Sequence, residues 1–324
     1  MVNLIHKGEG MLSKRATNLL SYCKNNGLQK SLVFVHFKLR SCIARNNLGW
    51  LIFYQMNPVV KTDKSNRFSD SVEKVWSDLQ KTQYLSLKEY KVDVGKFEEY
   101  IKATKMYYQN YYEGGLTGWK EHKKEKLLQH FLSFELLGIN SDDVFIDVAS
   151  NTSPVKDIVK DKYKIPSYKM DLAFEPGIHG ESIGCDASDT GLADNFVSKM
   201  TLHCSFEHFA YGSDIGFIKE SARILKVGGK VLIAPFYLID KYCIFQDPTL
   251  ECSLSIKDKE GAQIRYVRNL KVSYARFYSL DSFKERILSN CNNLQPTLYK
   301  INLDGLNKDG CYCHYILLLE KKTN

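Results

Sequence analysis

The residues best suited to acid–base chemistry stand together in the heptapeptide H-C-S-F-E-H-F, which follows a short apolar run. They are His203, Glu207 and His208. A histidine, whose ordinary pKa is near neutrality, is the natural base for taking a proton from a hydroxyl group. We choose His208 ahead of His203 as the base, because a residue beyond the end of a strand reaches farther over a ligand. The alternative is that Glu207 braces the following helix and that one histidine is packed in the core.

Three acids, Asp147, Asp171 and Asp186, each stand at the end of a short run that has the composition of a strand. Asp171 follows Asp147 at about the 20-residue distance at which a nucleotide-binding β-α-β unit places its ribose-binding carboxylate. Carboxylates accept hydrogen bonds from hydroxyl and amine donors. The position of Asp171 therefore suits a nucleotide ligand.

The element that must position Asp147 is the stretch D-D-V-F-I-D-V-A-S-N-T-S-P at residues 142–154. Its first half alternates like a strand, and a run of small polar residues then ends that strand. Ser153 before Pro154 predicts a helix N-cap followed by proline at the first helical position. A strand, tight turn and helix in this order aim backbone N–H groups at one point, where a ligand can bind.

The rest of the second half of the chain continues this alternation of strands and helices. An amphipathic helix is predicted at residues 214–225, ended by a glycine C-cap in K-V-G-G. Another helix is predicted to begin near residue 280, with Ser279 or Asp281 as its cap. Strands are predicted at residues 144–147, 167–171, 183–187, 200–204, 230–237, 297–303 and 311–320. This order of elements indicates an α/β fold.

The first turn lacks the pattern G-x-G-x-x-G, which disfavours a nicotinamide or flavin dehydrogenase. Residues 137–240 instead resemble the class I S-adenosylmethionine (SAM) methyltransferases, whose motif D-x-G-x-G-x-G follows the first strand. In this chain the acid of the motif is Asp147, and Ala149, Asn151 and Ser153 stand in place of the three glycines. The segments D-A-S-D-T-G-L-A-D-N-F-V-S-K-M and E-S-A-R-I-L-K-V-G-G-K-V-L-I carry the rest of the resemblance.

The resemblance implies a fold and a cofactor. The fold is α/β, a Rossmann-like seven-stranded mixed sheet with helices on both faces, preceded by a mainly helical N-terminal extension. The cofactor is SAM. Because no carboxylate cluster of the metal-dependent catechol type is evident, we expect a reaction without a metal ion.

The resemblance also implies cofactor-binding roles for particular residues. The backbone expected to cradle the methionine part of SAM, after Asp147, is that of Ala149, Ser150 and Asn151. Asp171 is expected to bind the ribose hydroxyls. Asp186 and Ala187 are expected to meet the adenine.

The two segments I-D-V-A-S-N-T-S-P and H-C-S-F-E-H-F look like those of uncharacterised methyltransferases in bacterial polysaccharide gene clusters. This resemblance implies O-methylation of a sugar or another small hydroxyl acceptor, in the synthesis of a surface polysaccharide. Two other classes stay open. A catalytically inactive scaffold with this fold would explain the glycine-free turn. A nucleotide-sugar enzyme would need a phosphate-binding loop, and none is visible.

The net charge of +8 is concentrated near the N-terminus, where residues 1–62 hold nine Lys and Arg residues and one acid. The same segment contains the aromatic-rich apolar run G-W-L-I-F-Y-Q-M. This combination suits an anionic membrane surface or a partner protein. The alternative is a solvated basic face over a small helical subdomain. A nucleic-acid partner is not expected, because no nucleic-acid-binding module is recognisable.

The composition favours a cytoplasmic protein, with the inner face of the membrane as a peripheral site. Hydrophobic residues make up 44% of the chain, enough for a substantial core. We see no apolar run of about 18 residues and no signal peptide. The nine cysteines are scattered without a C-x-x-C pair, which suits a reducing compartment and offers no zinc site.

The predicted domains are a basic segment at residues 1–62, a helical cap or linker region at 63–137 and a methyltransferase domain at 138–324. Residues 63–95 are expected to be a linker or loosely packed helices, and residues 96–137 to form two helices. The first of these helices carries a tyrosine cluster, which is expected to be a packed face or the lining of a sugar site. Its members are Tyr107, Tyr108, Tyr111 and Tyr112.

Overall fold

The computed structural model describes residues 72–109, 111, 123–247, 249–250, 261–267, 272–306 and 311–323. The chain divides into two compact units, one of residues 1–62 and 244–275 and the other of residues 63–243 and 276–324. The second, called the sheet unit below, contains every residue that the sequence proposed for the cofactor and for catalysis. The predictions made for residues 1–62 lie outside the described residues.

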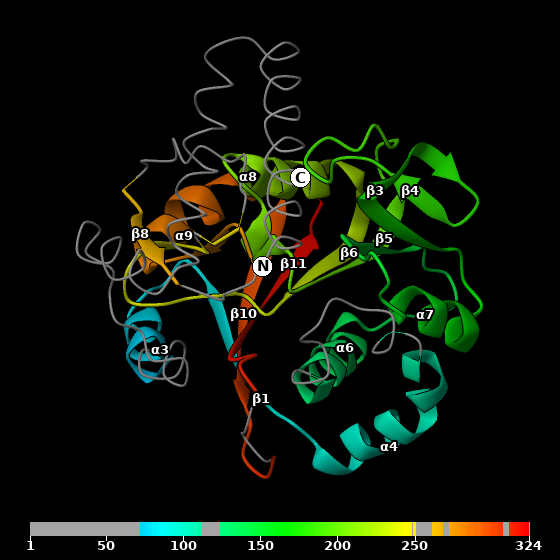
Figure 1. The fold of residues 1–324 in the computed structure, drawn as a ribbon, viewed down its shortest axis with the longest axis horizontal. Coiled ribbons are helices and arrows are strands. Elements are labelled where there is room, and N and C mark those ends of the chain that lie inside the picture. The colour runs from blue at the N-terminus through cyan, green and yellow to red at the C-terminus, as the bar shows by residue number, and fades with distance from the viewer. Residues whose placement is uncertain are drawn as a thin grey trace, which may run out of the picture. The chain divides into compact units, whose positions relative to one another are not determined.

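The sheet unit is built on one eight-stranded mixed sheet (Figure 1). In spatial order its strands are β1 (Ser86–Lys91), β10 (Leu294–Asn302), β11 (Tyr315–Lys321), β6 (Leu225–Ala234), β5 (Val197–His203), β2 (Phe145–Val148), β3 (Ser167–His179) and β4 (Ser182–Gly184). Strand β11 is antiparallel to both of its neighbours, and the other pairs are parallel. The predicted fold class, an α/β Rossmann-like mixed sheet, is confirmed.

Strand β1 is the eighth strand, which the sequence did not predict. It lies in the stretch expected to be a linker or loosely packed helices, and it pairs with β10 from Ser86 to Lys91. Helix α3 (Val72–Gln80) precedes it, and Trp76 Nε1 donates a 3.0 Å hydrogen bond to Glu89 of β1. Because β1 is the outermost strand in the sheet order and is only partly buried, its sequence S-L-K-E-Y-K lacks the apolar alternation that marks a strand.

Helices cover both faces of the sheet, and each face has its own apolar core (Figure 1). On one face, α3, α8 (Ser213–Ile224) and α9 (Leu280–Arg286) contribute buried residues such as Trp76, Phe217 and Phe283. On the other face lie α4 (Val94–Thr104), α6 (Lys123–Leu137) and α7 (Val155–Tyr163), with Phe97 and Leu128 among their buried residues. Because both faces are covered, every residue of the central strands β2 and β5 is buried.

Two predicted helix ends differ from the structure. Helix α8 ends at Ile224, and β6 begins at the next residue, so the glycines of K-V-G-G belong to the strand and do not cap the helix. At the start of α7 the N-cap is Pro154, one residue later than predicted. Ser153 still accepts a hydrogen bond of 3.3 Å from the backbone N–H of Val155. Ser279 caps α9 as predicted.

Strand β3 continues beyond Asp171 to His179 and folds back across β4. Gly184 pairs with Asp171 and again with Pro176 and Gly177. A Cβ atom on Gly184 would lie 2.0 Å from the carbonyl oxygen of Glu175, so only glycine fits beneath the crossing. Strand β4 therefore ends at Gly184, and Asp186 lies in the turn that follows it.

A second, three-stranded sheet occurs in the insertion that follows β6. Its strands are β7 (Cys243–Gln246), β8 (Gln263–Tyr266) and β9 (Ala275–Phe277), in the order β8-β7-β9. The sequence did not predict strands there. Short 3-10 helices complete the elements: η1 (Lys105–Tyr108), η3 (Phe206–His208) and η4 (Leu288–Asn290).

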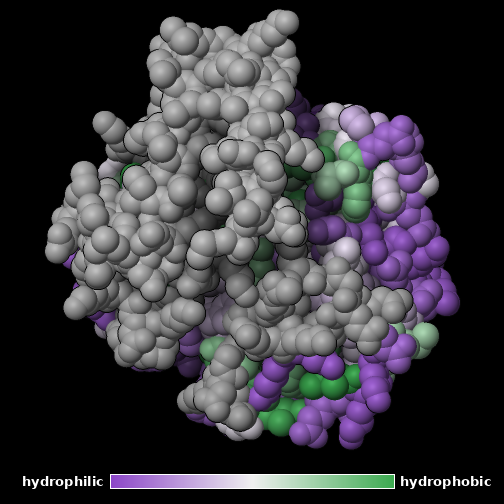
Figure 2. Space-filling model, viewed as in Figure 1, coloured by the Kyte–Doolittle hydropathy of each residue, from purple (hydrophilic) through white to green (hydrophobic). Residues whose placement is uncertain are grey.

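The surface of the sheet unit is strongly hydrophilic on the side of α7 (Figure 2). There Lys156 and Lys160 both form ion pairs with Glu181 of the turn between β3 and β4. None of the helices in the described part of the chain is long and apolar enough to cross a membrane.

Candidate functional site

The candidate site lies where the order of strands reverses. From β2 the chain passes through α7 to β3 on one side of β2, and it later returns to β5 on the other side. In open α/β sheets, ligands bind beyond the carboxyl ends of the strands at such a reversal. The residues predicted from the sequence lie near or after the carboxyl ends of β2, β4 and β5, and Asp171 lies within β3.

The turn from β2 to α7 has a left-handed backbone at two residues that are not glycine. Ala149 has a φ of 50° and Asn151 a φ of 41°. These are two of the three positions at which the motif quoted above has glycine. A left-handed residue with a Cβ atom is strained, and such strain persists where the surrounding structure imposes it.

Hydrogen bonds from the turn to the neighbouring strand hold this conformation. The backbone N–H of Ser150 donates to the carbonyl oxygen of Met170 at 3.1 Å. The backbone N–H of Asn151 donates to Asp171 Oδ2 at 2.9 Å, and the N–H of Ala173 donates to Asp171 Oδ1 at 2.9 Å. Asp171 therefore fixes the turn. A carboxylate has about four acceptor positions, so these two bonds leave room for a ligand hydroxyl.

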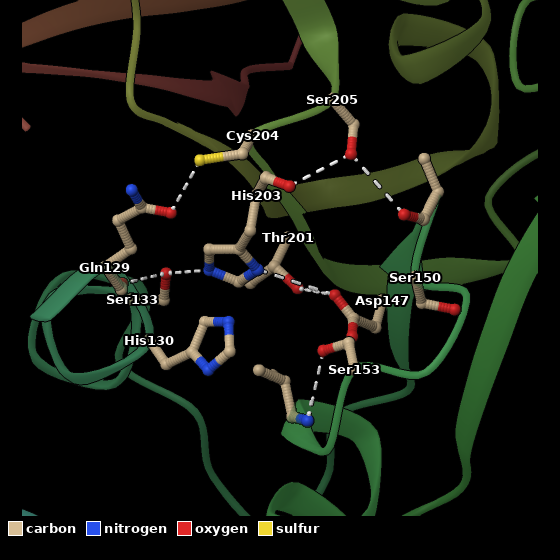
Figure 3. Close-up of polar contacts among 12 residues, drawn as sticks. Gln129, His130, Ser133, Asp147, Ser150, Ser153, Thr201, His203, Cys204 and Ser205 are labelled. Carbon is tan, nitrogen blue, oxygen red and sulfur yellow. Dashed lines mark hydrogen bonds and ion pairs between the residues drawn. The ribbon is translucent and has the colours of Figure 1, made fainter. Parts of the chain in front are cut away.

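The carboxylate of Asp147 is buried beneath the turn (Figure 3). Its Oδ1 atom accepts a 2.8 Å hydrogen bond from Thr201 Oγ1 on β5 and lies 3.6 Å from His203 Nδ1. On the other side of the imidazole, His203 Nε2 lies 2.7 Å from Ser133 Oγ on α6. A line of polar groups thus joins α6 to the ends of β5 and β2.

A second histidine, His130 of α6, lies against His203, with 4.5 Å between the ring centroids (Figure 3). Its Nδ1 atom is 2.6 Å from the hydroxyl of Tyr108, which is in turn 2.8 Å from the hydroxyl of Tyr100. Burial lowers the pKa of His130 well below its ordinary value, and the nearby His203 lowers it further. Tyr108 of the tyrosine cluster is thus buried and packed against His130. Tyr107, another member of the cluster, donates a 2.8 Å hydrogen bond to Asp161.

Three buried polar atoms of this group have no hydrogen-bond partner in the part of the chain that the structure describes. They are His130 Nε2, His203 Nδ1 and Asp147 Oδ2. Buried polar atoms are nearly always satisfied, so each exception asks for an explanation. The oxygen of Asp147 can accept from a ligand donor. Among the described residues, no group of three or more His, Cys, Asp and Glu side chains could hold a metal ion.

Glu207 and His208 lie in η3, which begins three residues after the end of β5. Glu207 is buried, whereas the side chain of His208 is 39% exposed. His208 Nε2 lies 3.7 Å from Glu207 Oε1, which is too long for a hydrogen bond. The structure thus brings His203 together with Asp147 and keeps His208 nearer to the solvent.

Two arginines hold the loop that follows η3. Arg276 donates to the carbonyl oxygens of Phe209 and Tyr211 at 3.1 and 2.7 Å. Arg286 donates to the same Tyr211 oxygen at 2.5 Å and forms a 2.8 Å ion pair with Asp214 at the start of α8. The two guanidinium groups and the carboxylate of Asp214 are buried, and they fix the loop that joins η3 to α8.

Asp186 and Ala187 lie in the turn after β4. Asp186 is exposed, and its Oδ1 atom accepts from the backbone N–H of Ser188 at 2.8 Å and from Ser188 Oγ at 2.7 Å. Ala187 is buried. The described contacts of Asp186 stay within its own turn, so the structure does not join it to the group around Asp147.

Comparison of the chain with protein-family models gave no match, and comparison with curated proteins gave none either. Among solved structures, the chain is similar to a complex of the Haloferax volcanii Trm112 methyltransferase activator with a candidate methyltransferase. The identity is 12% and the TM-score 0.43, and the match covers 70% of this chain and 97% of that chain. The chain is also similar to 1,6-didemethyltoxoflavin-N1-methyltransferase of Burkholderia thailandensis, solved with S-adenosylhomocysteine, at 12% identity and a TM-score of 0.43, covering 71% and 90%.

A third similar structure is geranyl diphosphate C-methyltransferase of Streptomyces coelicolor, solved with Mg²⁺, geranyl diphosphate and S-adenosylhomocysteine. The identity is 15% and the TM-score 0.38, covering 65% of this chain and 86% of that chain.

The sequence did not point to several residues of the site. His130 and Ser133 come from α6, far from β5 along the chain, and only their i, i+3 spacing on one helix links them. Thr201 could have been found, because it lies two residues before His203 and so points to the same side of the strand. Arg276 and Arg286 carried no recognisable signal.

Proposed function

We propose that this chain is a SAM-dependent methyltransferase. The observation that carries the proposal is the β2–α7 turn. Ala149 and Asn151 hold a left-handed backbone where the motif of that family has glycine, and Asp171 of the next strand fixes the turn. The turn lies beyond the carboxyl end of β2, at the point where the strand order reverses and where open α/β sheets bind their ligands.

The residues around this turn suit the groups of the proposed cofactor. Asp171 retains acceptor capacity for ribose hydroxyls, and Asp147 Oδ2 is a buried acceptor without a partner among the described residues. We assign Asp186 and Ala187 to the adenine and the backbone of Ala149 to Asn151 to the methionine part. When bound, SAM supplies an electrophilic methyl group on its sulfonium.

For the acceptor we propose a sugar or other small hydroxyl compound, in surface polysaccharide synthesis. The chain has to align the acceptor oxygen with the methyl group, which contributes at most about 7–11 kcal/mol, and to remove the hydroxyl proton, which adds about 10²–10⁴-fold. We assign proton removal to His208. His203 ranks second, because its imidazole is buried and lies at 2.7 Å from Ser133 Oγ.

Calorimetric titration with SAM and with S-adenosylhomocysteine tests the cofactor, with NAD as the control nucleotide. We expect one site per chain for both sulfur compounds and no heat from NAD. Failure of both to bind would overturn the proposal and favour a noncatalytic scaffold.

A mass-shift screen with SAM against glycans, lipids and small alcohols then identifies the acceptor. Single-turnover rates of His208→Ala, His203→Ala and Glu207→Gln test the base, after S-adenosylhomocysteine binding of each variant has been checked. For His208→Ala we expect a rate about 10²–10⁴-fold lower with unchanged cofactor affinity. Near wild-type rates in both histidine variants would rule out a histidine base.

A further inference from the structure

Glu207 is a buried carboxylate that has no hydrogen bond to any of the described residues. Its Oε2 atom is fully enclosed and has no partner, and its Oε1 atom has only the 3.7 Å approach of His208 Nε2 within the described structure. A buried carboxylate without donors is unfavourable, and proteins usually satisfy such groups. A donor from a bound molecule would satisfy it.

A series of stacked aromatic rings lies at the end of β6 and the start of β11. Tyr237 follows β6 and stacks on Phe277, with 4.4 Å between the ring centroids and 2° between the planes. Tyr312, which precedes β11, stacks on Tyr237 at 6.4 Å. Burial raises the pKa of Tyr237 well above its ordinary value, and Cys204 and Glu207 raise it further. The rings lie near the segment that carries Glu207, because Cys204, three residues before Glu207, has its Sγ atom 3.8 Å from the hydroxyl of Tyr312.

Cys204 and helix α6 both contact Tyr312. Cys204 follows β5, and its Sγ atom lies 3.1 Å from Gln129 Oε1 and 3.8 Å from the hydroxyl of Tyr312. Glu125 of α6 accepts the backbone N–H of Tyr312 at 2.9 Å. These contacts hold Tyr312 at the carboxyl ends of β5 and β6, one strand away from the turn that we assign to the cofactor.

We propose that Glu207, Tyr237 and Tyr312 form the acceptor site and that it takes a neutral, hydroxyl-rich sugar ring. The inference rests on the proposed function. The carboxylate accepts hydrogen bonds from ring hydroxyls, and the aromatic side chains pack against the C–H groups of the ring. Glu207 then determines specificity, because an acceptor with a carboxylate of its own would meet a like charge in a buried place. We do not assign it the role of the base.

The test begins with S-adenosylhomocysteine binding by calorimetry, which separates the two proposals. Failure at that step removes the proposed function and the acceptor site with it. In the saturated complex, saturation-transfer NMR titrations measure the binding of methyl glucoside, methyl galactoside and methyl mannoside, each beside the methyl glycoside of its uronic acid. We expect at least one neutral glycoside to bind, and its uronic acid to bind about tenfold more weakly.

The variant Glu207→Gln keeps the shape of the side chain and removes its charge. It should bind the neutral glycoside and its uronic acid about equally, with an unchanged thermal midpoint or a higher one. Tyr237→Leu should lose glycoside binding and keep S-adenosylhomocysteine binding. The matched control is Glu175→Gln, an exposed glutamate of β3, which should retain the wild-type preference.

Two results would overturn the acceptor site while leaving the proposed function intact. One is a chain that binds S-adenosylhomocysteine but none of the three neutral glycosides. The other is a Glu207→Gln variant that still discriminates against the uronic acid as the wild type does.

Discussion

The backbone N–H of Asn151 donates a 2.9 Å hydrogen bond to the carboxylate of Asp171, which ties the turn after β2 to β3. Asp171→Ala removes this bond and the bond from the N–H of Ala173. Hydrogen bonds to charged groups contribute about 1.5–3 kcal/mol, so S-adenosylhomocysteine affinity should fall by about 10- to 150-fold. Calorimetric titration measures the change. Asp142→Ala, an exposed acid before β2, is the control and should bind like the wild type. Equal affinity of Asp171→Ala and the wild type would mean that Asp171 neither shapes the turn for the ligand nor contacts the ligand.

The left-handed backbone at Ala149 makes an unusual prediction about glycine. Glycine at this position relieves about 1–2 kcal/mol of left-handed strain in the folded state, which stabilises the protein. It also makes the unfolded chain more flexible, which costs about 0.5–1 kcal/mol of stability. Ala149→Gly should therefore increase the free energy of unfolding by up to about 1.5 kcal/mol. Urea unfolding measures it. Ala222→Gly, inside helix α8, should instead decrease it by about 0.5–1 kcal/mol. A loss of stability in both variants would show that the methyl group of Ala149 is needed for packing.

The depressed pKa of His130 makes stability depend on pH. Burial is the main cause, and the nearby His203 and Lys126 lower the pKa of His130 further. The unfolded chain binds a proton near pH 6.5 and the folded chain does not, so stability is lost as the pH falls below that value. The loss is at most about 1.4 kcal/mol per pH unit.

His130→Asn keeps a polar atom for Tyr108 and cannot titrate. Between pH 6.5 and 5 its free energy of unfolding should fall less steeply than that of the wild type, as measured by urea unfolding at each pH. His314, whose pKa burial also lowers, is present in both proteins and cancels in the difference. Identical slopes would show that His130 takes up its proton in the folded state as easily as in the unfolded chain.

The ion pairs of Asp214 predict a large stability effect. Burial alone would raise the pKa of this carboxyl, but the hydrogen bond from Arg286 and the charge of Arg276 outweigh it, and the net pKa is lowered. Asp214→Asn leaves two buried guanidinium groups without their carboxylate, so the free energy of unfolding should fall by about 3–5 kcal/mol. Asp78→Asn removes an exposed pair with Lys81 and should leave the unfolding midpoint unchanged. A small effect in Asp214→Asn would show that the arginines find other acceptors.

The central strands could be predicted because they are buried on both faces, which demands the apolar, β-branched runs that the sequence shows. The cap of α9 could be predicted because Ser279 acts within its own turn. Strand β1 could not, because the outermost strand in the sheet order buries too little to need a periodic pattern. The glycines of K-V-G-G were misassigned because the same residues that end helices also allow an irregular strand start, here at Gly228 with a φ of 77°.

The candidate site shows the same division between local and distant signals. The alternating small residues at Ala149 and Asn151 lie where the left-handed backbone occurs, and a local motif can carry that information. The environment of His203 depends on Ser133 and His130, which only the packing of α6 on the sheet brings near. The arginines that hold Tyr211 come from β9 and α9, and no spacing rule connects them with the loop that they hold.

Strand β11 lies between β6 and β10, although it is the last of the described strands along the chain. Strands β1 and β10 are joined to the rest of the sheet only through it. During synthesis, the part of the sheet with β1 and β10 therefore cannot pair with the part that begins at β6 until residues 315–321 have left the ribosome. In that interval β6 and β10 each present an unpaired edge, and such edges attract other chains. A nascent chain stalled before Tyr315 should accordingly depend on chaperones far more than the released protein does.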